Sequence, residues 1–359
     1  MKAGVLHTIH GGVQIEDAPN PVLDPNSDQV LIKMAVCAIG AGEPRVALHD
    51  PATMNARMPT VNLPQIMGRR GGTGVVAATG KLVTRIKEGD RVLIRDNPSC
   101  GHCLFCRNGR EHLCQGNNSW TRGGFSAGFM AEYARAPERM VTALPPEVGF
   151  DEAIMIIAAA VGYRALKIAQ LKIADTVIIT GATGGTGACA VLCALAFGAA
   201  RVIAVARSSE RLEKLTAVAP RRIVPITGRE TLIDKVMEVT EGRGAGVLLD
   251  LIPNDPKTLE AAIECVQPGG SIVPMGRGSE GLRIPLNRLT QKGWEVRGST
   301  AAYLSDLGEL VELVRFGALN FSPVTVVRFP IERVNEGLKM VLDRPGDNIF
   351  CVGIEVHND

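Results

Sequence analysis

The sequence lacks an excess of charge of either sign, because 39 Lys and Arg residues stand against 37 Asp and Glu residues, for a formal net charge of +2. Nucleic acids and anionic membrane surfaces attract proteins through clustered positive charge, so neither is an expected partner. The chain also has no apolar run of the roughly 20 residues that a membrane-spanning helix needs. Its opening residues, MKAGVLHTIHGGVQIED, become polar too early for a secretory signal peptide. We therefore expect a cytoplasmic protein.

The length of 359 residues predicts about two domains with ample core. Residues 1–154 contain short apolar strands separated by Gly and Pro, which indicates a β-rich domain. Residues 155–300 alternate strands with helices, a pattern that predicts a parallel sheet covered on both faces. The tail has strand–helix–strand character, and we expect residues 301–359 to complete the first domain. Expected strands include 30–36, 72–79, 91–95, 176–180, 201–206 and 246–252.

Four of the nine cysteines fall in the single stretch CGHCLFCRNGREHLC, as Cys100, Cys103, Cys106 and Cys114. Four thiolates on one loop can close a tetrahedral shell around Zn²⁺ with no open position, which is typical of a structural site. Disulfides or scattered buried thiols are the alternative. We expect a zinc lobe over about residues 96–115, with both histidines of the stretch, His102 and His112, facing solvent.

The other five cysteines lie in apolar, strand-like or helix-like segments and are expected to be buried free thiols, as suits a reducing cytoplasm. They are Cys37, Cys189, Cys193, Cys265 and Cys351.

A glycine-rich turn follows the strand expected at residues 176–180. It consists of Gly181, Ala182, Thr183, Gly184, Gly185, Thr186 and Gly187, and a helix follows it. Glycines at such a turn let the backbone approach a pyrophosphate, while the helix N-terminus supplies N–H donors and a positive dipole end. Strand, turn and helix in this order favour a dinucleotide site over a turn without a ligand.

The end of the next strand indicates which dinucleotide is bound. An NAD site usually places an acid there to bind the ribose 2′-OH. Here Ala206 takes that position, and Arg207, Ser208 and Arg211 follow. A guanidinium with nearby hydroxyls suits a 2′-phosphate, so the sequence favours NADP(H), the alternative being arginines that only face solvent. Two further cofactor candidates lie at the ends of later strands, Ile252 and Gly276.

With these motifs, the chain resembles the zinc-containing alcohol dehydrogenases of the medium-chain dehydrogenase/reductase superfamily. The resemblance covers nearly the whole chain and includes GVVAATGKLVTRIKEGDRVLI, GFMAEYARAP and TLEAAIECVQPGGSIVPMG. It implies an α/β protein with a GroES-like catalytic domain, a Rossmann domain with a doubly wound parallel sheet, and an active site in a cleft between them. It also implies a homodimer or homotetramer that acts on a small molecule.

The family's catalytic zinc ligands have no counterpart in this chain. In the run CAIGAGE, Gly40 stands at the position of the family's first Cys ligand. Gly42 stands where the family has the Ser or Thr of its proton relay. The family's Gly-His-Glu is Gly68-Arg69-Arg70, and its third ligand falls near Ile157. Cys37 is the nearest remaining thiol, and a single thiolate does not make a site. The resemblance thus implies one structural zinc ion, and the residues predict no catalytic zinc.

Loss of the catalytic metal removes the usual Lewis acid for carbonyl–alcohol exchange. Superfamily members without it commonly reduce C=C bonds conjugated to a carbonyl, where an enolate oxygen needs only hydrogen-bond donors. Arg69 and Arg70 could donate them, with Glu43 and His49 as further catalytic candidates. Alternatively, the arginines pair with Glu43 or Asp50 and are structural. The expected function is NADPH-dependent reduction of an enone or enal, the alternatives being a metal-free alcohol dehydrogenase or ketone reductase, or a nucleotide-binding protein with a decayed active site.

Overall fold

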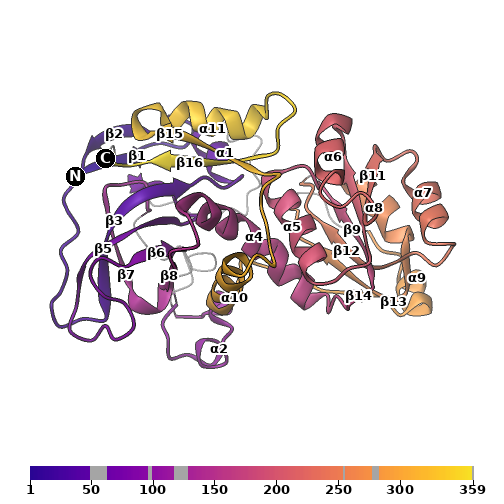
Figure 1. The fold of residues 1–359 in the computed structure, drawn as a ribbon, viewed down its shortest axis with the longest axis horizontal. Coiled ribbons are helices and arrows are strands. Elements are labelled where there is room, and N and C mark those ends of the chain that lie inside the picture. Colours follow the sequence, from indigo (N-terminus) through magenta and orange to yellow (C-terminus); the bar gives the residue numbers. More distant parts are fainter. Residues whose placement is uncertain (49–62, 96–98, 117–127, 254, 277–282, 358–359) are drawn as a thin grey trace.

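The computed structural model describes residues 1–48, 63–95, 99–116, 128–253, 255–276 and 283–357. Two sheets dominate it, with helices α4, α5 and α10 between them (Figure 1). The expected α/β architecture, a GroES-like β-rich part and a Rossmann-type parallel sheet, is confirmed. None of the described helices is both long and apolar enough to cross a membrane.

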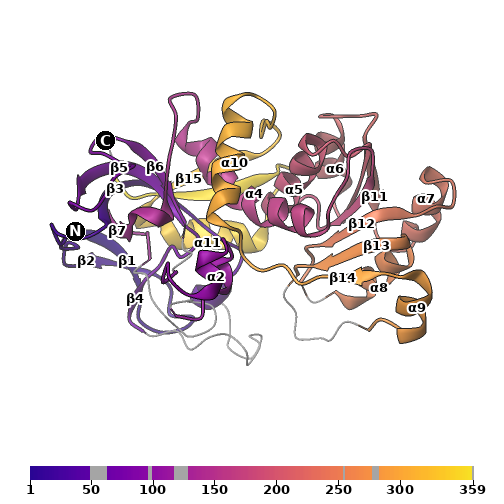
Figure 2. The ribbon, with the colours of Figure 1, turned by 90° about the horizontal axis from the view of Figure 1, so that it is seen from below.

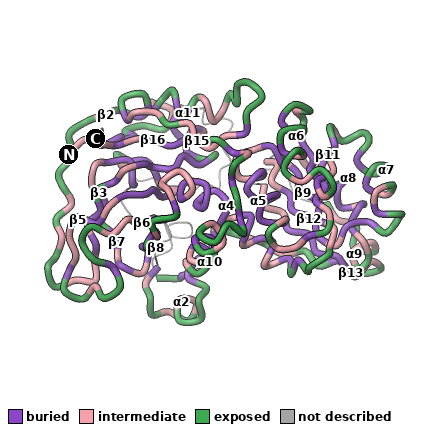
Figure 3. The backbone as a smooth tube through the Cα atoms, in the orientation of Figure 1, coloured by how far each residue is buried: buried purple, intermediate pink, exposed green. Residues whose placement is uncertain are grey.

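The larger sheet of the β-rich part is antiparallel except for the parallel pair β15 and β16, and its strand order is β15-β16-β3-β5-β6-β8, with β7 also pairing to β3. Buried residues alternate along β3, which places Ile32, Met34 and Val36 in the core (Figure 3). The bounds are β3 (Gln29–Ala38), β5 (Gly72–Thr79), β6 (Arg91–Ile94), β7 (Tyr133–Pro137), β8 (Val141–Ala143), β15 (Thr325–Pro330) and β16 (Phe350–Glu355). A smaller sheet contains β1 (Lys2–Leu6), β2 (Gln14–Asp17) and β4 (Gln65–Ile66).

The parallel sheet has the order β11-β10-β9-β12-β13-β14, so the strand order reverses between β9 and β12. Ligands of such sheets bind outside the carboxyl ends of the strands at this reversal. The strands are β9 (Thr176–Thr180), β10 (Arg201–Ala206), β11 (Ile223–Thr227), β12 (Ala245–Asp250), β13 (Val266–Pro274) and β14 (Glu295–Val296). The helices are α5 (Gly185–Ala196), α6 (Ser209–Thr216), α7 (Leu232–Val239), α8 (Pro256–Glu264) and α9 (Leu286–Lys292).

The tail returns to the β-rich part through β15 and β16. β16 pairs with β3 through Gly353 opposite Ala38 and Ile354 opposite Cys37, and α11 (Val334–Asp343) packs on it. Other helices are α1 (Glu43–Leu48), α2 (Leu104–Arg107), α4 (Phe150–Ile168) and α10 (Leu304–Arg315), with 3₁₀ turns at Glu111–Leu113, Glu138–Met140 and Ile331–Arg333. Helix α4 runs without a break through the expected domain boundary near residue 154.

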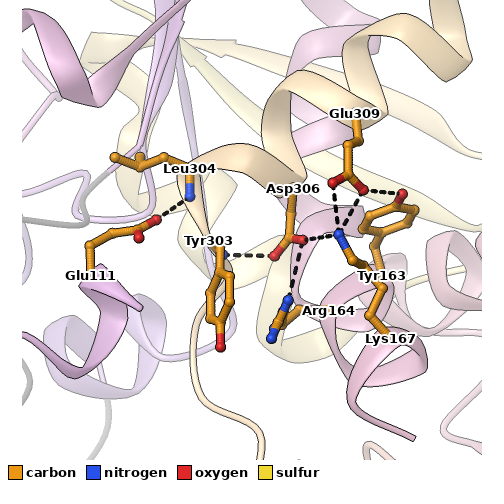
Figure 4. A network of polar contacts seen from close by, with 8 residues as sticks. All are labelled: Glu111, Tyr163, Arg164, Lys167, Tyr303, Leu304, Asp306 and Glu309. Atoms are coloured by element: carbon orange, nitrogen blue, oxygen red, sulfur yellow. Dashed lines mark hydrogen bonds and ion pairs between the residues drawn. The ribbon is translucent and has the colours of Figure 1, made fainter. Parts of the chain in front are cut away.

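A polar network joins α4 to α10 (Figure 4). The buried carboxylate of Asp306 accepts hydrogen bonds from the Tyr303 N–H at 2.8 Å and from Lys167 Nζ at 3.0 Å. Glu309 accepts from the Tyr163 hydroxyl at 2.6 Å and also binds Lys167. Removing one member of such a network leaves a buried charge without its partner, which is strongly destabilising. The network therefore holds α10 against α4.

The two central parallel strands are also joined by a polar contact at their carboxyl ends. The Thr180 hydroxyl of β9 donates to Asp250 Oδ1 of β12 at 2.5 Å, and the Asp250 carbonyl accepts from the Gly276 N–H at 2.9 Å. Burial raises the pKa of Asp250 to about 6, although the Thr180 hydroxyl opposes the rise. An ionised Asp250 is therefore costly to the folded chain.

We predict a pH-dependent gain in stability for Asp250→Asn. In the unfolded chain Asp250 loses its proton near pH 3.8, whereas the folded chain holds it to about pH 6. Folded stability from this group is therefore lost as pH rises between these values, by up to about 3 kcal/mol, and Asn does not titrate. Urea unfolding of both proteins should show a difference that grows in favour of Asn from about pH 4 to about pH 6 and stays level at higher pH. Parallel curves across this window would contradict the assignment.

Candidate functional site

The four cysteines of the zinc lobe converge as their spacing predicted. Their sulfur atoms all lie within 4.8 Å of one another, including Cys103–Cys106 at 3.5 Å, Cys100–Cys106 at 3.9 Å and Cys103–Cys114 at 4.0 Å. A tetrahedron with Zn–S bonds of about 2.3 Å has sulfur–sulfur edges of about 3.8 Å. The donor set and its dimensions therefore fit a structural Zn²⁺, and it is the metal-binding cluster found among the described residues.

Backbone N–H groups point at these sulfur atoms. The Cys100 N–H donates to Cys114 Sγ at 3.2 Å, and the Cys103 N–H donates to Cys100 Sγ at 3.3 Å. The pKa of Cys103 is lowered to about 6, chiefly by the backbone N–H of Cys106. The backbone thus favours a thiolate at Cys103, whereas burial raises the pKa of Cys106 to about 12.

His112 does not face solvent, which corrects the sequence-based expectation, whereas His102 is exposed as predicted. The 3₁₀ turn Glu111–Leu113 carries the His112 ring under the lobe, where it stacks on Tyr303 with ring centroids 4.2 Å apart. Burial lowers the pKa of His112 to about 4, helped by Arg164 and Arg110. The lobe is therefore docked on the segment that precedes α10, where α2 and α10 lie close in both views (Figure 2).

The glycine-rich turn lies between β9 and α5 at the reversal of the strand order. Gly181 has φ 67°, in the left-handed region that favours glycine. A Cβ on Gly187 would lie 2.1 Å from the Gly181 carbonyl oxygen, and one on Gly185 would lie 2.7 Å from the Phe350 carbonyl oxygen. Gly184, by contrast, caps α5 with its nearest contact at 3.5 Å. Close packing behind an open helix N-terminus is the shape that a pyrophosphate site needs.

The other predicted residues of the turn also differ in how far they are buried. Ala182 and Thr183 are buried, while Thr186 is half-buried on the first turn of α5. Ile252 and Gly276 lie beside the turn: Ile252 Cγ1 is 3.3 Å from a Cβ placed on Gly181, and a Cβ on Gly276 would lie 2.1 Å from the Ile252 carbonyl oxygen. The structure thus brings these predicted cofactor residues together at the carboxyl edge of the sheet.

The three residues predicted to bind a 2′-phosphate are engaged differently. Arg207 is exposed. Ser208 caps α6, because its hydroxyl accepts the Arg211 N–H at 3.3 Å. The buried Arg211 side chain donates to the carbonyls of Arg344 and Gly346, both at 2.6 Å. Only Arg207 of the three is therefore left open to a ligand.

Glu43 is buried and binds backbone rather than substrate-facing groups. Its Oε2 accepts the Gly40 N–H at 2.8 Å, and its Oε1 accepts the N–H groups of Gly68 and Arg69, each at 2.9 Å. Burial raises the pKa of Glu43, while these three N–H groups and the Arg70 charge oppose the rise. The carboxylate therefore ties the loop of Gly40 to the loop of Arg69, which are the two loops where the family carries zinc ligands.

Arg70 links this region to the glycine-rich turn. Its Nη2 donates to the Thr186 hydroxyl at 3.0 Å and to the Ala158 carbonyl at 3.5 Å. Its Cδ lies 3.2 Å from the position of a Cβ on Gly40, so the arginine packs where a ligand side chain would begin. Arg69 is half-buried and makes a further interaction of its own. His49 and Asp50 lie outside the described residues.

The other positions near the absent ligands are apolar or inert. Ile157 is fully buried in the core. Cys37 is also fully buried, and burial raises its pKa well above the usual value, with Glu43 adding to the rise. A thiolate at Cys37 is thus disfavoured. Cys189, Cys193 and Cys265 are buried free thiols as predicted, whereas Cys351 is only partly buried.

Two arginines of this region were not predicted: Arg344, which lies near the turn, and Arg45, whose charge acts on Arg344. Arg344 Nη1 lies 3.5 Å from the position of a Cβ on Gly184. The positive charges of Arg211, Arg207 and Arg45 all lower the pKa of Arg344, after the effect of burial. No local motif marks either residue, because both come from segments far from the turn in the sequence.

Comparison with known proteins agrees with this geometry. Residues 26–146 match the alcohol dehydrogenase GroES-like domain, and residues 185–315 match the zinc-binding dehydrogenase family. A sorbitol dehydrogenase of Bacillus subtilis is 31% identical over 80% of this chain and 78% of its own. An alcohol dehydrogenase of Geobacillus stearothermophilus is 30% identical over 94% of both chains. The structure of an NAD-dependent alcohol dehydrogenase superposes with a TM-score of 0.83, at 27% identity over 99% of this chain and 100% of that one.

A helix N-terminus open to phosphate at the reversal of a parallel sheet is the arrangement of oxidoreductases that use a nicotinamide cofactor. The similar proteins identify the family within this class. The chain belongs to the alcohol dehydrogenase-like branch of the medium-chain dehydrogenase/reductase superfamily, and it is an oxidoreductase.

We predict that Cys103→Ser impairs folding rather than turnover alone. Losing one thiolate opens the tetrahedral site, and structural zinc contributes directly to folding free energy. The variant should give less soluble protein and melt about 5–10 °C lower. A strong chelator should lower the melting temperature of the unaltered protein, but not that of Cys103→Ser. The control is Cys265→Ser, outside the lobe, which should keep its sensitivity to the chelator; equal behaviour of both variants would refute the assignment.

We also predict that Glu43→Gln destabilises the fold by about 1–3 kcal/mol. The carboxamide offers one acceptor oxygen, so at least one of the three N–H groups now bound by Glu43 would face an NH₂ group. Urea unfolding measures the loss. The exposed Glu88→Gln is the matched control and should stay within about 0.5 kcal/mol of the unaltered protein. A Glu43→Gln variant that is as stable as this control would show that the carboxylate does not hold the two loops.

Proposed function

We propose that this oxidoreductase uses NADP(H), acts without a catalytic zinc ion and reduces a C=C bond conjugated to a carbonyl group. The observation that carries the proposal is the position of Arg70. Its guanidinium contacts Thr186 of the glycine-rich turn at 3.0 Å and packs beside Gly40, at a position where the family has a metal ligand.

The proposal of zinc-free chemistry rests on the side chains at the ligand positions. Gly40 and Ile157 offer no donor atom, and an arginine replaces the histidine at residue 69. The neighbouring charge of Arg70 opposes a divalent cation. The buried Cys37 thiol resists ionisation. One buried thiol that resists ionisation does not meet the ligand requirement of Zn²⁺.

Arg70 can provide the electrophile that alkene reduction needs. When bound, a reduced nicotinamide supplies hydride to the β-carbon of the substrate. The electron pair of the C=C bond then moves toward the carbonyl, and negative charge develops on its oxygen. The N–H groups of Arg70 that do not bind Thr186 or Ala158 can donate to this oxygen, and a charge-assisted donor strengthens as the charge develops. The α-carbon takes a proton, for which His49 stays the candidate donor.

The proposed preference for NADP(H) rests on the end of β10. Ala206 provides no carboxylate to bind a ribose 2′-OH or to repel a 2′-phosphate, and the exposed Arg207 is next to it. One structural relative is an NAD-dependent alcohol dehydrogenase, so the affinities for NADPH and NADH need a direct measurement.

A second candidate is metal-free reduction of a ketone, or the reverse oxidation of an alcohol. The names of the relatives favour it, since they include sorbitol dehydrogenase and alcohol dehydrogenases. Identification of products distinguishes the two candidates, because alkene reduction yields a saturated carbonyl compound and ketone reduction yields an alcohol.

We predict that Arg70→Ala lowers kcat and kcat/KM together by about 10²–10³, because the lost donor acts mainly in the transition state. Activity is measured with NADPH and NADH against enals, enones and ketones, with products identified. Arg70→Lys should retain part of kcat, since it keeps the charge but not the planar fork.

Three outcomes would contradict the proposal. A rise in KM alone would mean that Arg70 only anchors the substrate. Lower thermal stability with unchanged kinetics would make Arg70 structural. No turnover by the unaltered protein with either cofactor would favour a nucleotide-binding protein whose active site has decayed.

A further inference from the structure

The loop that follows α11 is fixed against α6, beside the end of β10. Arg211 donates to the carbonyls of Arg344 and Gly346 at 2.6 Å, and Lys214 forms an ion pair with Asp347 at 2.7 Å. In Figure 1 this loop leaves α11 and reaches toward α6. The tail thus contributes a side chain, that of Arg344, to the edge of the parallel sheet where the adenosine half of a dinucleotide is expected.

The guanidinium of Arg344 lies beside the glycine-rich turn, and its backbone carbonyl is bound by Arg211 of α6, the helix that follows β10. Its Nη1 and Nη2 are 3.5 and 3.8 Å from the position of a Cβ on Gly184. Part of Arg344 is exposed, and within the described part of the chain its guanidinium has no carboxylate partner. The nearby Asp347 is already paired with Lys214.

The charges around Arg344 are positive. Packed protein lowers the pKa of its guanidinium, and so do Arg211, Arg207 and Arg45. Arg211 donates its hydrogen bonds to backbone carbonyls. The guanidinium groups of Arg207 and Arg344, in contrast, can both donate hydrogen bonds to one anion. Two guanidinium groups suit a phosphate dianion, since each can donate two hydrogen bonds to it.

The backbone gives a second indication that Arg344 is not there for the stability of the free protein. Arg344 ends α11 at φ 45° and ψ 59°, the left-handed conformation that glycine adopts without strain. An arginine at this position strains the backbone and adds to a like-charged cluster. The backbone strain and the repulsion between like charges both destabilise the unliganded chain. A bound anion offsets the repulsion.

We propose that Arg344 and Arg207 together bind the 2′-phosphate of the dinucleotide, so that a residue from the C-terminal tail determines cofactor selectivity. This inference rests on the proposed use of NADP(H). It replaces the predicted role of Arg211, which holds the tail loop in place and positions Arg344 instead of binding the ligand.

The test uses the full-length, zinc-loaded protein and two fragments of the dinucleotide, 2′,5′-ADP and 5′-AMP, with binding measured by isothermal titration calorimetry. Arg344→Gly removes the guanidinium and suits the left-handed backbone, so the variant should fold. We expect its affinity for 2′,5′-ADP to fall about 10- to 100-fold, while 5′-AMP changes by less than about threefold. Arg344→Lys should lose less. Lys339→Ala, an exposed position on the same helix, removes one charge as a control and should change neither affinity.

Two further readouts separate binding from a structural role. The melting temperature of unliganded Arg344→Gly should equal or exceed that of the unaltered protein, whereas a structural arginine would lower it. If both arginines bind one phosphate, the double variant with Arg207→Ala should lose less than the product of the two single losses.

The outcomes distinguish this inference from the proposed function. If the unaltered protein binds 2′,5′-ADP no better than 5′-AMP, the NADP(H) proposal fails and the inference falls with it. If it prefers 2′,5′-ADP and Arg344→Gly keeps that preference, only the inference fails. Equal weakening of both fragments would place Arg344 at the pyrophosphate side and would also overturn it.

Discussion

The buried carboxylate of Glu43 is the contact on which the rest of the site depends. Two loops, those of Gly40 and Arg69, direct three N–H groups at it. Buried N–H groups without an acceptor are costly, and the single carboxylate of Glu43 accepts hydrogen bonds from all three. The same anion partly balances the charge of Arg70. The loops can therefore keep their positions while the side chains at the ligand positions change from metal donors to glycine and arginine.

The C-terminal tail is the second constraint, because it touches both halves of the molecule. β16 completes the antiparallel sheet through β3, and the Phe350 carbonyl closes against Gly185 of the glycine-rich turn. The loop before β16 is held on α6 by Arg211. A dinucleotide bound at this turn would therefore meet groups from both sheets. Any motion of one sheet relative to the other would change the binding site as well as the catalytic region.

Local patterns in the sequence predicted the local structures. The spacing of Cys100 to Cys114 placed four sulfur atoms within bonding distance of one ion, and the strands at 72–79, 176–180 and 201–206 begin and end as expected. Such features depend on residues close together in the chain, whose geometry is set by turns and by the period of apolar residues.

Contacts between distant segments could not be predicted in this way. His112 is buried because Tyr303 stacks on it. Arg211 was expected to bind the cofactor, but it donates hydrogen bonds to carbonyls more than a hundred residues away in the sequence. Ser208 was predicted to bind the cofactor, and its hydroxyl caps α6. The two arginines missed by the sequence, Arg45 and Arg344, reach the region through the packing of α1 and α11. Pairings of this kind follow from the tertiary fold, which no single motif encodes.

The central claim is that no catalytic zinc ion binds at the family's ligand positions, where Arg70 packs beside Gly40. Elemental analysis of the protein purified with ample zinc tests it most directly, since the proposal assigns one ion to the lobe of four cysteines and none to the ligand positions of the family. The account predicts about one zinc ion per chain, lost when the lobe is disrupted. Two ions per chain, with one retained after the lobe is disrupted, would contradict it.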